Sequence, residues 1–226
     1  MLHTSCYFPP AESADAEGLL LFGGELTSDW ILDAYRHGIF PWPVFEDVEL
    51  MAWWSPDPRA VIELDQMHVS HRLQRTLRSG RFRVSVDRAF AGVIRGCATA
   101  QDRRGATWLT PEMIRVYTEL YDMGYAHSVE VWHQDRLAGG VYGIAMGAFF
   151  SAESMFYRVR DASKVALVHL VQRLQLRGYD LLDIQQLTEH TQRLGATEIS
   201  RGQYLVRLLR AMQRPASFST GLESRV

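Results

Sequence analysis

The sequence predicts an α+β protein in which a small N-terminal domain precedes a larger domain with a mixed, largely antiparallel sheet. Two proline-rich stretches, 39–45 and 53–59, are unsuited to the interior of a helix, and the second is typical of a rigid linker or domain edge. Beyond it, short alternating segments of the strand type are interleaved with amphipathic segments of the helix type. We therefore expect an N-terminal domain over 1–58, a second domain over 59–212 and a flexible tail over 213–226.

The N-terminal domain contains one clear helix signal. Its first residues are polar and rich in proline and alanine, which favours irregular structure. Thr27 is a suitable N-cap residue, and Gly38 is a suitable C-terminal stop. Between them, Ile31, Ala34 and Tyr35 fall on one side of the helix. This side is expected to pack on a core.

In the second domain, segments with the hydrophobic period of a helix alternate with segments that have the period of a strand. The segment 127–145 predicts a hairpin, because two apolar runs flank the polar turn HQDR. In chain order, the other patterns predict a helix at 70–80, a strand at 82–86, a helix capped by Asp87, a helix begun by Thr110, a strand at 148–156, a helix begun by Asp161 or Ser163, a strand at 180–187 and a last helix with Tyr204, Leu205, Leu208, Leu209 and Met212 on one face. The order strand–helix–helix–hairpin–strand–helix–strand is the one expected of a GNAT-type N-acyltransferase fold.

Composition excludes several classes of protein. The formal charge of the 226 residues is -2, so any nucleic-acid contact must come from a local basic face. The two cysteines, Cys6 and Cys97, form no CxxC pair, and none of the eight histidines has a recognised metal spacing. No apolar run approaches the roughly 20 residues that span a bilayer, and the N-terminus does not resemble a signal peptide. We expect a cytoplasmic protein without a metal.

Nine segments stand along the chain in a fixed order, from about residue 18 to 212: FGGELT (22–27), AYRHGIFPW (34–42), WWSPDPRAV (53–61), TWLTPEM (107–113), GYAHSVEVW (124–132), LAGGVYGI (137–144), ESMF (153–156), ASKVAL (162–167) and LLDIQQLTEHTQRLGATEISR (181–201). Together they resemble the leucyl/phenylalanyl-tRNA–protein transferase family. The resemblance implies a two-domain chain whose C-terminal part uses aminoacyl-tRNA in place of acyl-coenzyme A. It also implies transfer of Leu or Phe, with Met as a further candidate, to the N-terminal Arg or Lys of an acceptor protein, which marks that protein for degradation.

Asp183 and Gln185 lie in the predicted strand LLDIQQ, where positions i and i+2 point to the same face. Such a pair fits an orienting or proton-accepting role, but the pattern alone favours a buried Asp bonded to a helix end. The resemblance implies catalytic roles at both positions. Whether Asp183 is the base or orients Gln185 stays open. Removing either side chain is expected to lower turnover about 10²-fold with little effect on folding.

Glu153 follows AFFSA in another predicted strand. A carboxylate there could bind the α-ammonium or the Arg or Lys side chain of an acceptor. The alternative is a structural ion pair with Arg158 or Lys164. The resemblance implies a catalytic role for Glu153. This chain departs from the family pattern at Ala152 and Tyr157, so neither is given a role.

Further residues are candidates for substrate contacts. The resemblance favours an apolar pocket for the Leu or Phe side chain, with the candidate residues Phe150, Met155, Val141 and Leu182. For each of them, packing in the hydrophobic core is at least as good an interpretation. Trp42 and Trp108 stand beside prolines or loop boundaries. An exposed aromatic there could stack on the 3′ adenosine of tRNA. Core packing is again the alternative.

The densest basic stripe of the chain lies on the predicted 70–80 helix and just after it, and it comprises Arg72, Arg75, Arg78, Arg81 and Arg83. It is a candidate contact with the tRNA backbone, or else a solvated helix face.

The sequence argues against two other functions. An acyl-CoA N-acetyltransferase normally marks its pyrophosphate loop with glycines, and the corresponding RVRDASK has none. A non-catalytic tRNA-binding module would not need Asp183, Gln185 and Glu153. The expected partners are therefore aminoacyl-tRNA and acceptor proteins, with no cofactor and no membrane, and the protein is expected to be a monomer.

Overall fold

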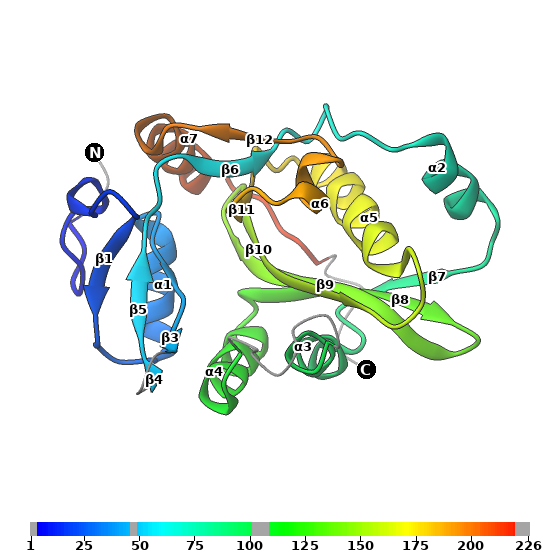
Figure 1. Ribbon diagram of the computed structural model, residues 1–226, viewed down its shortest axis with the longest axis horizontal. Coiled ribbons are helices and arrows are strands. Elements are labelled where there is room, and N and C mark those ends of the chain that lie inside the picture. Colours follow the sequence, from blue (N-terminus) through cyan, green and yellow to red (C-terminus); the bar gives the residue numbers. More distant parts are fainter. Residues whose placement is uncertain (1–3, 46–48, 101–108, 220–226) are drawn as a thin grey trace.

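The computed structural model describes residues 4–45, 49–100 and 109–219, and its N-terminal part forms a small sheet beside a larger one (Figure 1). The elements of this part are the 3-10 helix η1 (Ala11–Ser13), β1 (Leu19–Phe22), α1 (Ser28–Arg36), β2 (Phe40–Pro41), β3 (Val44–Phe45), β4 (Glu49–Leu50) and β5 (Ala52–Trp54). The sheet has the order β1-β5-β2, and β3 pairs with β4. α1 begins at the predicted cap, because the Thr27 side chain accepts a hydrogen bond from the Trp30 N–H.

A seven-stranded sheet in the order β12-β6-β11-β10-β9-β8-β7 forms the centre of the larger part. The strands are β6 (Arg59–Ile62), β7 (Arg83–Val86), β8 (Ala126–His133), β9 (Arg136–Met146), β10 (Phe149–Tyr157), β11 (Leu181–Gln185) and β12 (Ala196–Ile199). The helices are α2 (His71–Arg78), α3 (Phe90–Ala98), α4 (Pro111–Asp122), α5 (Ala162–Leu176), α6 (Glu189–Gln192) and α7 (Arg201–Gln213). Only β10 and β11 are parallel neighbours in this sheet. The predicted α+β class and element order are confirmed, whereas β6 and β12 were not expected, because all four residues of β6 are buried and two adjacent residues of β12 are exposed, so neither strand alternates.

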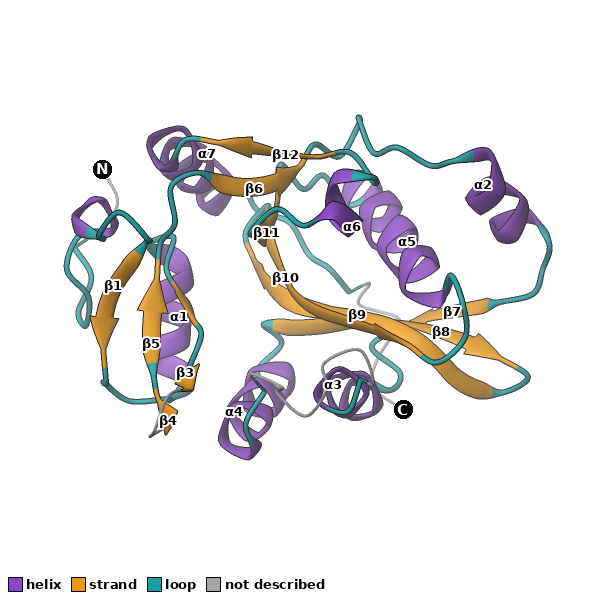
Figure 2. Ribbon diagram, in the orientation of Figure 1, coloured by secondary structure: helices purple, strands orange, loops and turns teal. Residues whose placement is uncertain are grey.

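Helices cover both faces of this sheet. α3 and α4 lie on one face and α5 on the other (Figures 1 and 2), which gives two hydrophobic cores. β9 runs between the cores, and Gly139 and Gly140 allow the helices to approach it closely. A Cβ at Gly139 would lie 2.7 Å from the Cβ of Ala162 in α5, and one at Gly140 would lie 2.9 Å from the Cγ2 of Val93 in α3. No helix in the described ranges is long and apolar enough to cross a bilayer.

The helix caps agree with the predictions in part. Thr110 caps α4 as predicted, by accepting a hydrogen bond from the Met113 N–H. The prediction for Asp87 is wrong, because the N-cap of α3 is Ala89. Asp87 adopts a left-handed φ of 54°, and its carboxylate accepts a hydrogen bond from the Ser128 N–H (2.8 Å). The carboxylate is thereby directed to β8 and away from the helix end.

The segment after α7 packs against the sheet as far as Phe218, which differs from the expected flexible tail. Phe218 is 2% exposed, and its ring stacks on those of Phe150 and His127 at centroid distances of 5.1 and 4.6 Å. Arg173 Nε donates a hydrogen bond to the Phe218 carbonyl oxygen (2.8 Å). A single aromatic residue in a polar segment has no periodicity, so its burial could not be predicted.

The two parallel strands separate near the middle of the sheet. β10 pairs with β11 only over Phe149–Ser151 and Leu181–Asp183. Both strands then change register against their other neighbours, after Ala152 in β10 and after Asp183 in β11. Gln185 has a φ of 58°, so the backbone leaves the strand conformation there. The predicted catalytic residues lie at this point of separation.

Candidate active site

Glu153 is the centre of a polar cluster at the point where β10 and β11 separate. Its Oε1 accepts hydrogen bonds from Ser151 Oγ (2.8 Å) and Gln185 Nε2 (3.0 Å), and its Oε2 accepts one from Tyr117 OH (3.2 Å). The Tyr117 hydroxyl in turn lies 2.9 Å from that of Tyr35. Two of the three predicted catalytic residues, Glu153 and Gln185, are therefore in direct contact, although they are 32 positions apart.

Asp183, the third predicted catalytic residue, lies beside this cluster in a fully buried ion pair. Arg59 binds both carboxylate oxygens, through Nε to Oδ1 (3.0 Å) and through a terminal nitrogen to Oδ2 (2.7 Å). The Tyr204 hydroxyl donates to Oδ2 (2.8 Å), and the Gln185 N–H donates to Oδ1 (2.9 Å). Four donors fill the acceptor capacity of a carboxylate. Asp183 is thus arranged to hold the backbone of Gln185 in its bulged conformation.

The ionisation of these groups follows from their burial. Burial raises the pKa of Glu153 to about 7, with hydrogen bonds from Ser151 and Tyr117 opposing the shift and the charge of Asp183 adding to it. Burial lowers the pKa of Arg59, but the charge of Asp183 outweighs this effect and keeps the guanidinium pKa above its ordinary value. The site therefore holds one permanent ion pair and one carboxyl group that can exchange a proton near neutral pH.

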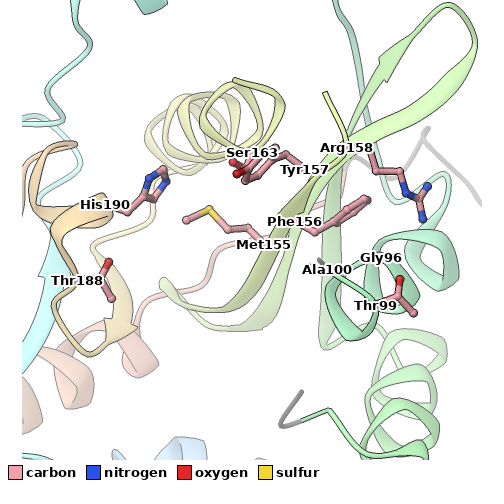
Figure 3. A pocket seen from close by; sticks show the side chains of 10 residues that line it. All are labelled: Gly96, Thr99, Ala100, Met155, Phe156, Tyr157, Arg158, Ser163, Thr188 and His190. Carbon is pink, nitrogen blue, oxygen red and sulfur yellow. The ribbon is translucent and has the colours of Figure 1, made fainter. Parts of the chain in front are cut away.

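A cavity of about 890 Å³ lies along the end of β10 (Figure 3). The described residues that line it are Gly96, Thr99, Ala100, Met155, Phe156, Tyr157, Arg158, Ser163, Thr188 and His190. Met155 is two residues beyond Glu153 on β10, and Thr188 is three residues beyond Gln185 after β11. Thr188 and His190 lie on one side of Met155 and Thr99 on the other (Figure 3). The lining of the cavity thus starts two residues beyond Glu153 and three residues beyond Gln185 along the chain, and the residues that line it are distinct from those of the polar cluster.

The predicted pocket residues divide into two groups. Phe150, Val141 and Leu182 are at most 2% exposed and lie in the core between the sheet and α5. Met155 is partly buried and is the one of the four that lines the described cavity. A side-chain pocket built from the other three stays a prediction.

Of the two tryptophans predicted to stack on tRNA, the structure describes only Trp42. Trp42 is 41% exposed, and its carbonyl oxygen accepts a hydrogen bond from Trp54 Nε1 (2.9 Å). Trp108 lies outside the described residues. The stacking role of both side chains stays a prediction.

The basic stripe lies on α2 and the segment that follows it. Arg72 forms an ion pair with the carboxylate of Asp161, the N-cap residue of α5, at an N–O distance of 3.0 Å. Arg75 and Arg78 are exposed, with no ion pair to the described residues. The guanidinium groups of Arg81 and Arg83 lie over aromatic rings, those of Phe82 and Trp132 respectively.

Several residues of the site were not predicted from the sequence, namely Arg59, Tyr35, Tyr117, Ser151 and Tyr204. Arg59 lies 124 positions from Asp183, so no local pattern joins the two. One general rule could have indicated these residues, namely that a buried tyrosine hydroxyl or guanidinium group requires a hydrogen-bond partner. The rule can be used only once it is known which residues are buried.

Comparisons with known proteins identify the family to which this sequence is similar. A family model described as leucyl/phenylalanyl-tRNA protein transferase matches residues 61–209, and the model of its N-terminal domain matches 24–57. The chain is 49% identical over 205 residues to the leucyl/phenylalanyl-tRNA–protein transferase of Azoarcus sp. (strain BH72), covering 90% of this chain and 86% of that one. It is 50% identical over 210 residues to that of Anaeromyxobacter sp. (strain K), covering 92% and 89%.

Among solved structures, L-PGS from Bacillus licheniformis has a TM-score of 0.44 and 11% identity, over 81% of this chain and 70% of that one. This likeness is too distant to bear on the assignment, which rests on the family models and on the relatives at about half identity. The chain belongs to the leucyl/phenylalanyl-tRNA–protein transferase family.

Proposed function

We propose that this protein transfers leucine or phenylalanine, with methionine as a further candidate, from charged tRNA to the N-terminal Arg or Lys of an acceptor protein. The observation that carries the proposal is the contact between Glu153 and Gln185, together with a cavity of about 890 Å³ whose lining starts within three residues of each along the chain. Membership of the family supports the two substrate classes. The new N-terminal residue would mark the acceptor for degradation.

In the proposed reaction, the acceptor α-amine attacks the carbonyl carbon of the ester between the amino acid and tRNA. A C–N bond forms, the C–O ester bond breaks, and a proton passes from the amine to the leaving ribose oxygen. Glu153 is the candidate carrier of this proton, because its pKa of about 7 is close to the ~8 of an N-terminal amine. As a carboxylate it would also attract the acceptor's ammonium group.

Gln185 is the proposed positioning partner of the amine. Its Nε2 is held by Ser151 Oγ (2.8 Å) and by Glu153, while its Oε1 has no hydrogen-bond partner among the described residues. A fixed carboxamide oxygen can accept a hydrogen bond from an incoming amine. Asp183 supports Gln185 through the backbone N–H, and Arg59 and Tyr204 hold Asp183 in place.

The proposed function is tested by incubating the protein with radiolabelled Leu-tRNA and a peptide that starts with Arg. Label should enter the peptide without ATP and equally with or without EDTA, because the ester is already activated. The described residues contain no group of His, Cys, Asp and Glu that could hold a metal ion. Labelled acetyl-CoA and a peptide that starts with Asp are the negative controls. Acetyl transfer in place of leucyl transfer would contradict the proposal, and zinc-restored activity after EDTA would contradict its metal-free chemistry.

Gln185→Ala is expected to lower single-turnover transfer about 10²-fold, because the amine loses a fixed acceptor. The melting temperature should change little, since the interactions of Asp183 with Arg59 and with the backbone at position 185 remain. The matched control is Gln186→Ala, which removes the same group from the adjacent, exposed position. Equal activity of the two variants would remove Gln185 from the mechanism.

The basic stripe on α2 is proposed to contact the tRNA backbone. Reversing the charge of Arg75 and Arg78 should weaken tRNA binding and reduce the log–log salt slope by about 0.7–0.9 for each lost phosphate contact. Arg72 is left in place because it is paired with Asp161. The control is Arg210→Glu on the exposed side of α7. An unchanged slope in the Arg75 and Arg78 variant would mean that the stripe is a solvated face.

We further propose that one chain is the active unit, since the Glu153 cluster and the Asp183–Arg59 pair are complete within it. The domain division after residue 58 and the cytoplasmic location remain predictions.

A further inference from the structure

We propose that one face of the small N-terminal sheet is a docking surface for the acceptor protein, and that it binds the extended segment behind the acceptor's basic N-terminal residue. The surface is called the apolar patch and consists of Phe22, Trp42 and Leu50. The inference rests on the proposed function, because it assigns the second substrate to a surface outside the polar cluster around Glu153 and outside the described cavity lining.

The side chains of the apolar patch are brought together by strand pairing. Phe22 in β1 is directly opposite Ala52 in β5, and from the other side Trp42 donates its backbone N–H to the Ala52 carbonyl oxygen (2.9 Å). Directly opposite residues of antiparallel strands point to the same face, as do residues two apart along an extended chain, which adds Leu50. Phe22, Trp42 and Leu50 are 51%, 41% and 43% exposed. Neighbouring large apolar side chains with this exposure are typical of a protein-binding surface.

The apolar patch lies on the sheet face that also supports the candidate active site. Phe40 precedes Trp42 by two residues and therefore points to the same face of the small sheet. The Arg59 guanidinium group lies 4.7 Å from the centre of the Phe40 ring, and it also binds Asp183 beside the polar cluster. The patch thus begins one strand repeat, about 7 Å, beyond a residue that contacts the support of the site.

Charge complementarity selects a polypeptide with a basic N-terminus as the occupant. Residues 1–58 contain ten Asp and Glu, one Arg and no Lys, a formal charge of -9, so residues 59–226 carry +7 of the total of -2. Glu25, three residues after Phe22, and Asp29 are exposed and form no ion pair with the described residues. An acceptor that begins with Arg or Lys has two positive charges, on that side chain and on its α-ammonium group. Its N-terminus is therefore attracted to this part of the protein.

The same charges argue against RNA at the apolar patch, because the phosphates of tRNA are repelled by a formal charge of -9. The small sheet and α2, which carries the basic stripe, lie at opposite ends of the molecule, with β10 between them (Figure 1). In this arrangement the acceptor approaches from the acidic end, tRNA approaches from the end with the basic stripe, and the two meet at the polar cluster on β10.

The test compares two acceptors, the dipeptide Arg-Ala and a peptide of about ten residues that starts with Arg and continues with apolar and neutral residues. Ten extended residues span up to ~33 Å, about the diameter of a small domain. Phe22→Ala should raise the KM of the long peptide about 5–10-fold, as expected for truncation of an aromatic contact, and that of the dipeptide by less than about 2-fold. Trp42 is left in place, because it is also a candidate for the tRNA 3′ end. The affinity for Leu-tRNA, measured by filter binding, should not change.

A second measurement tests the charge with the wild-type protein, so it does not depend on the folding of a variant. A long peptide with two Lys residues after its Arg should have a KM about 5-fold lower than one with two Glu residues there, at low salt and saturating Leu-tRNA. The ratio should approach 1 as the ionic strength rises, because exposed charges are screened. Glu25→Gln should reduce the low-salt ratio by about 2-fold.

Leu176→Ala and Glu198→Gln are the matched controls, because they remove an apolar and an acidic side chain that are exposed elsewhere on the protein. Both should behave as wild type. An unchanged KM of the long peptide in Phe22→Ala, an equal rise for the dipeptide, or equal KM values of the Lys and Glu peptides at low salt would overturn the inference. Loss of tRNA affinity in Phe22→Ala would also overturn it, since the patch would then bind RNA. Absence of leucyl transfer to both acceptors by the wild-type protein would instead contradict the proposed function itself.

Discussion

Asp183→Ala is expected to lower the free energy of unfolding by about 3–5 kcal/mol, because it leaves a buried guanidinium group without its counter-charge. Arg59 is 1% exposed and would keep only the Gly38 carbonyl oxygen (3.1 Å) and the Tyr204 hydroxyl (3.4 Å) as hydrogen-bond partners. For a chain of this size the loss corresponds to a fall of about 6–20 °C in melting temperature. Thermal and urea unfolding of the purified variant measure it.

The double variant Arg59→Met with Asp183→Asn is the control, because it removes both charges. It should be more stable than Asp183→Ala, since no unpaired buried charge remains. An Asp183→Ala protein as stable as wild type would contradict the importance of this pair. The large expected effect also corrects the sequence-based expectation that folding changes little on removal of Asp183. Turnover of an Asp183 variant must therefore be normalised to the folded fraction.

Glu153→Gln is expected to lower single-turnover transfer by about 10²–10⁴-fold, because an amide cannot take the proton of the amine. In the wild type, the rate should rise as the pH passes through about 7, where Glu153 becomes a carboxylate, and it should rise again as the amine titrates near ~8. The variant should lack the first of these rises. Rates measured from pH 5.5 to 9 at saturating tRNA would separate them, and an unchanged rise near 7 in the variant would exclude Glu153 as its source.

Glu153→Gln should increase the stability of the protein, although it lowers the rate of transfer. The folded-state pKa of Glu153 lies above the ordinary 4.5, so the native state is favoured by protonation and loses stability as the pH rises from about 4.5 to 7. Glu153→Gln avoids this loss. We expect it to be more stable than wild type by about 1 kcal/mol at pH 8 and nearly equal at pH 4.5, a small effect because Glu153 is partly exposed and water screens its charge. Glu198→Gln, at an exposed position of β12, is the control.

The amino-acid sequence by itself determined the elements whose signals are local. The cap at Thr27, the turn between β8 and β9 and the long apolar face of α5 depend on residues within one or two turns of the chain, so their patterns could be recognised before any tertiary structure was known. The motif LLDIQQ likewise placed Asp183 and Gln185 in one strand, and both belong to β11, although its pairing with β6 changes register between them.

The tertiary structure alone decided which distant groups meet. The pairing of Arg59 with Asp183, the contact of Glu153 with Gln185 and the burial of Phe218 join residues that are far apart in sequence, and none of them has a periodic signal. The bulge at Gln185 depends on the carboxylate that accepts its N–H, and the pKa of Glu153 depends on how far the fold removes it from water. Ion pairing, desolvation and the walls of a cavity are properties of packed surfaces, so the chain must fold before they exist.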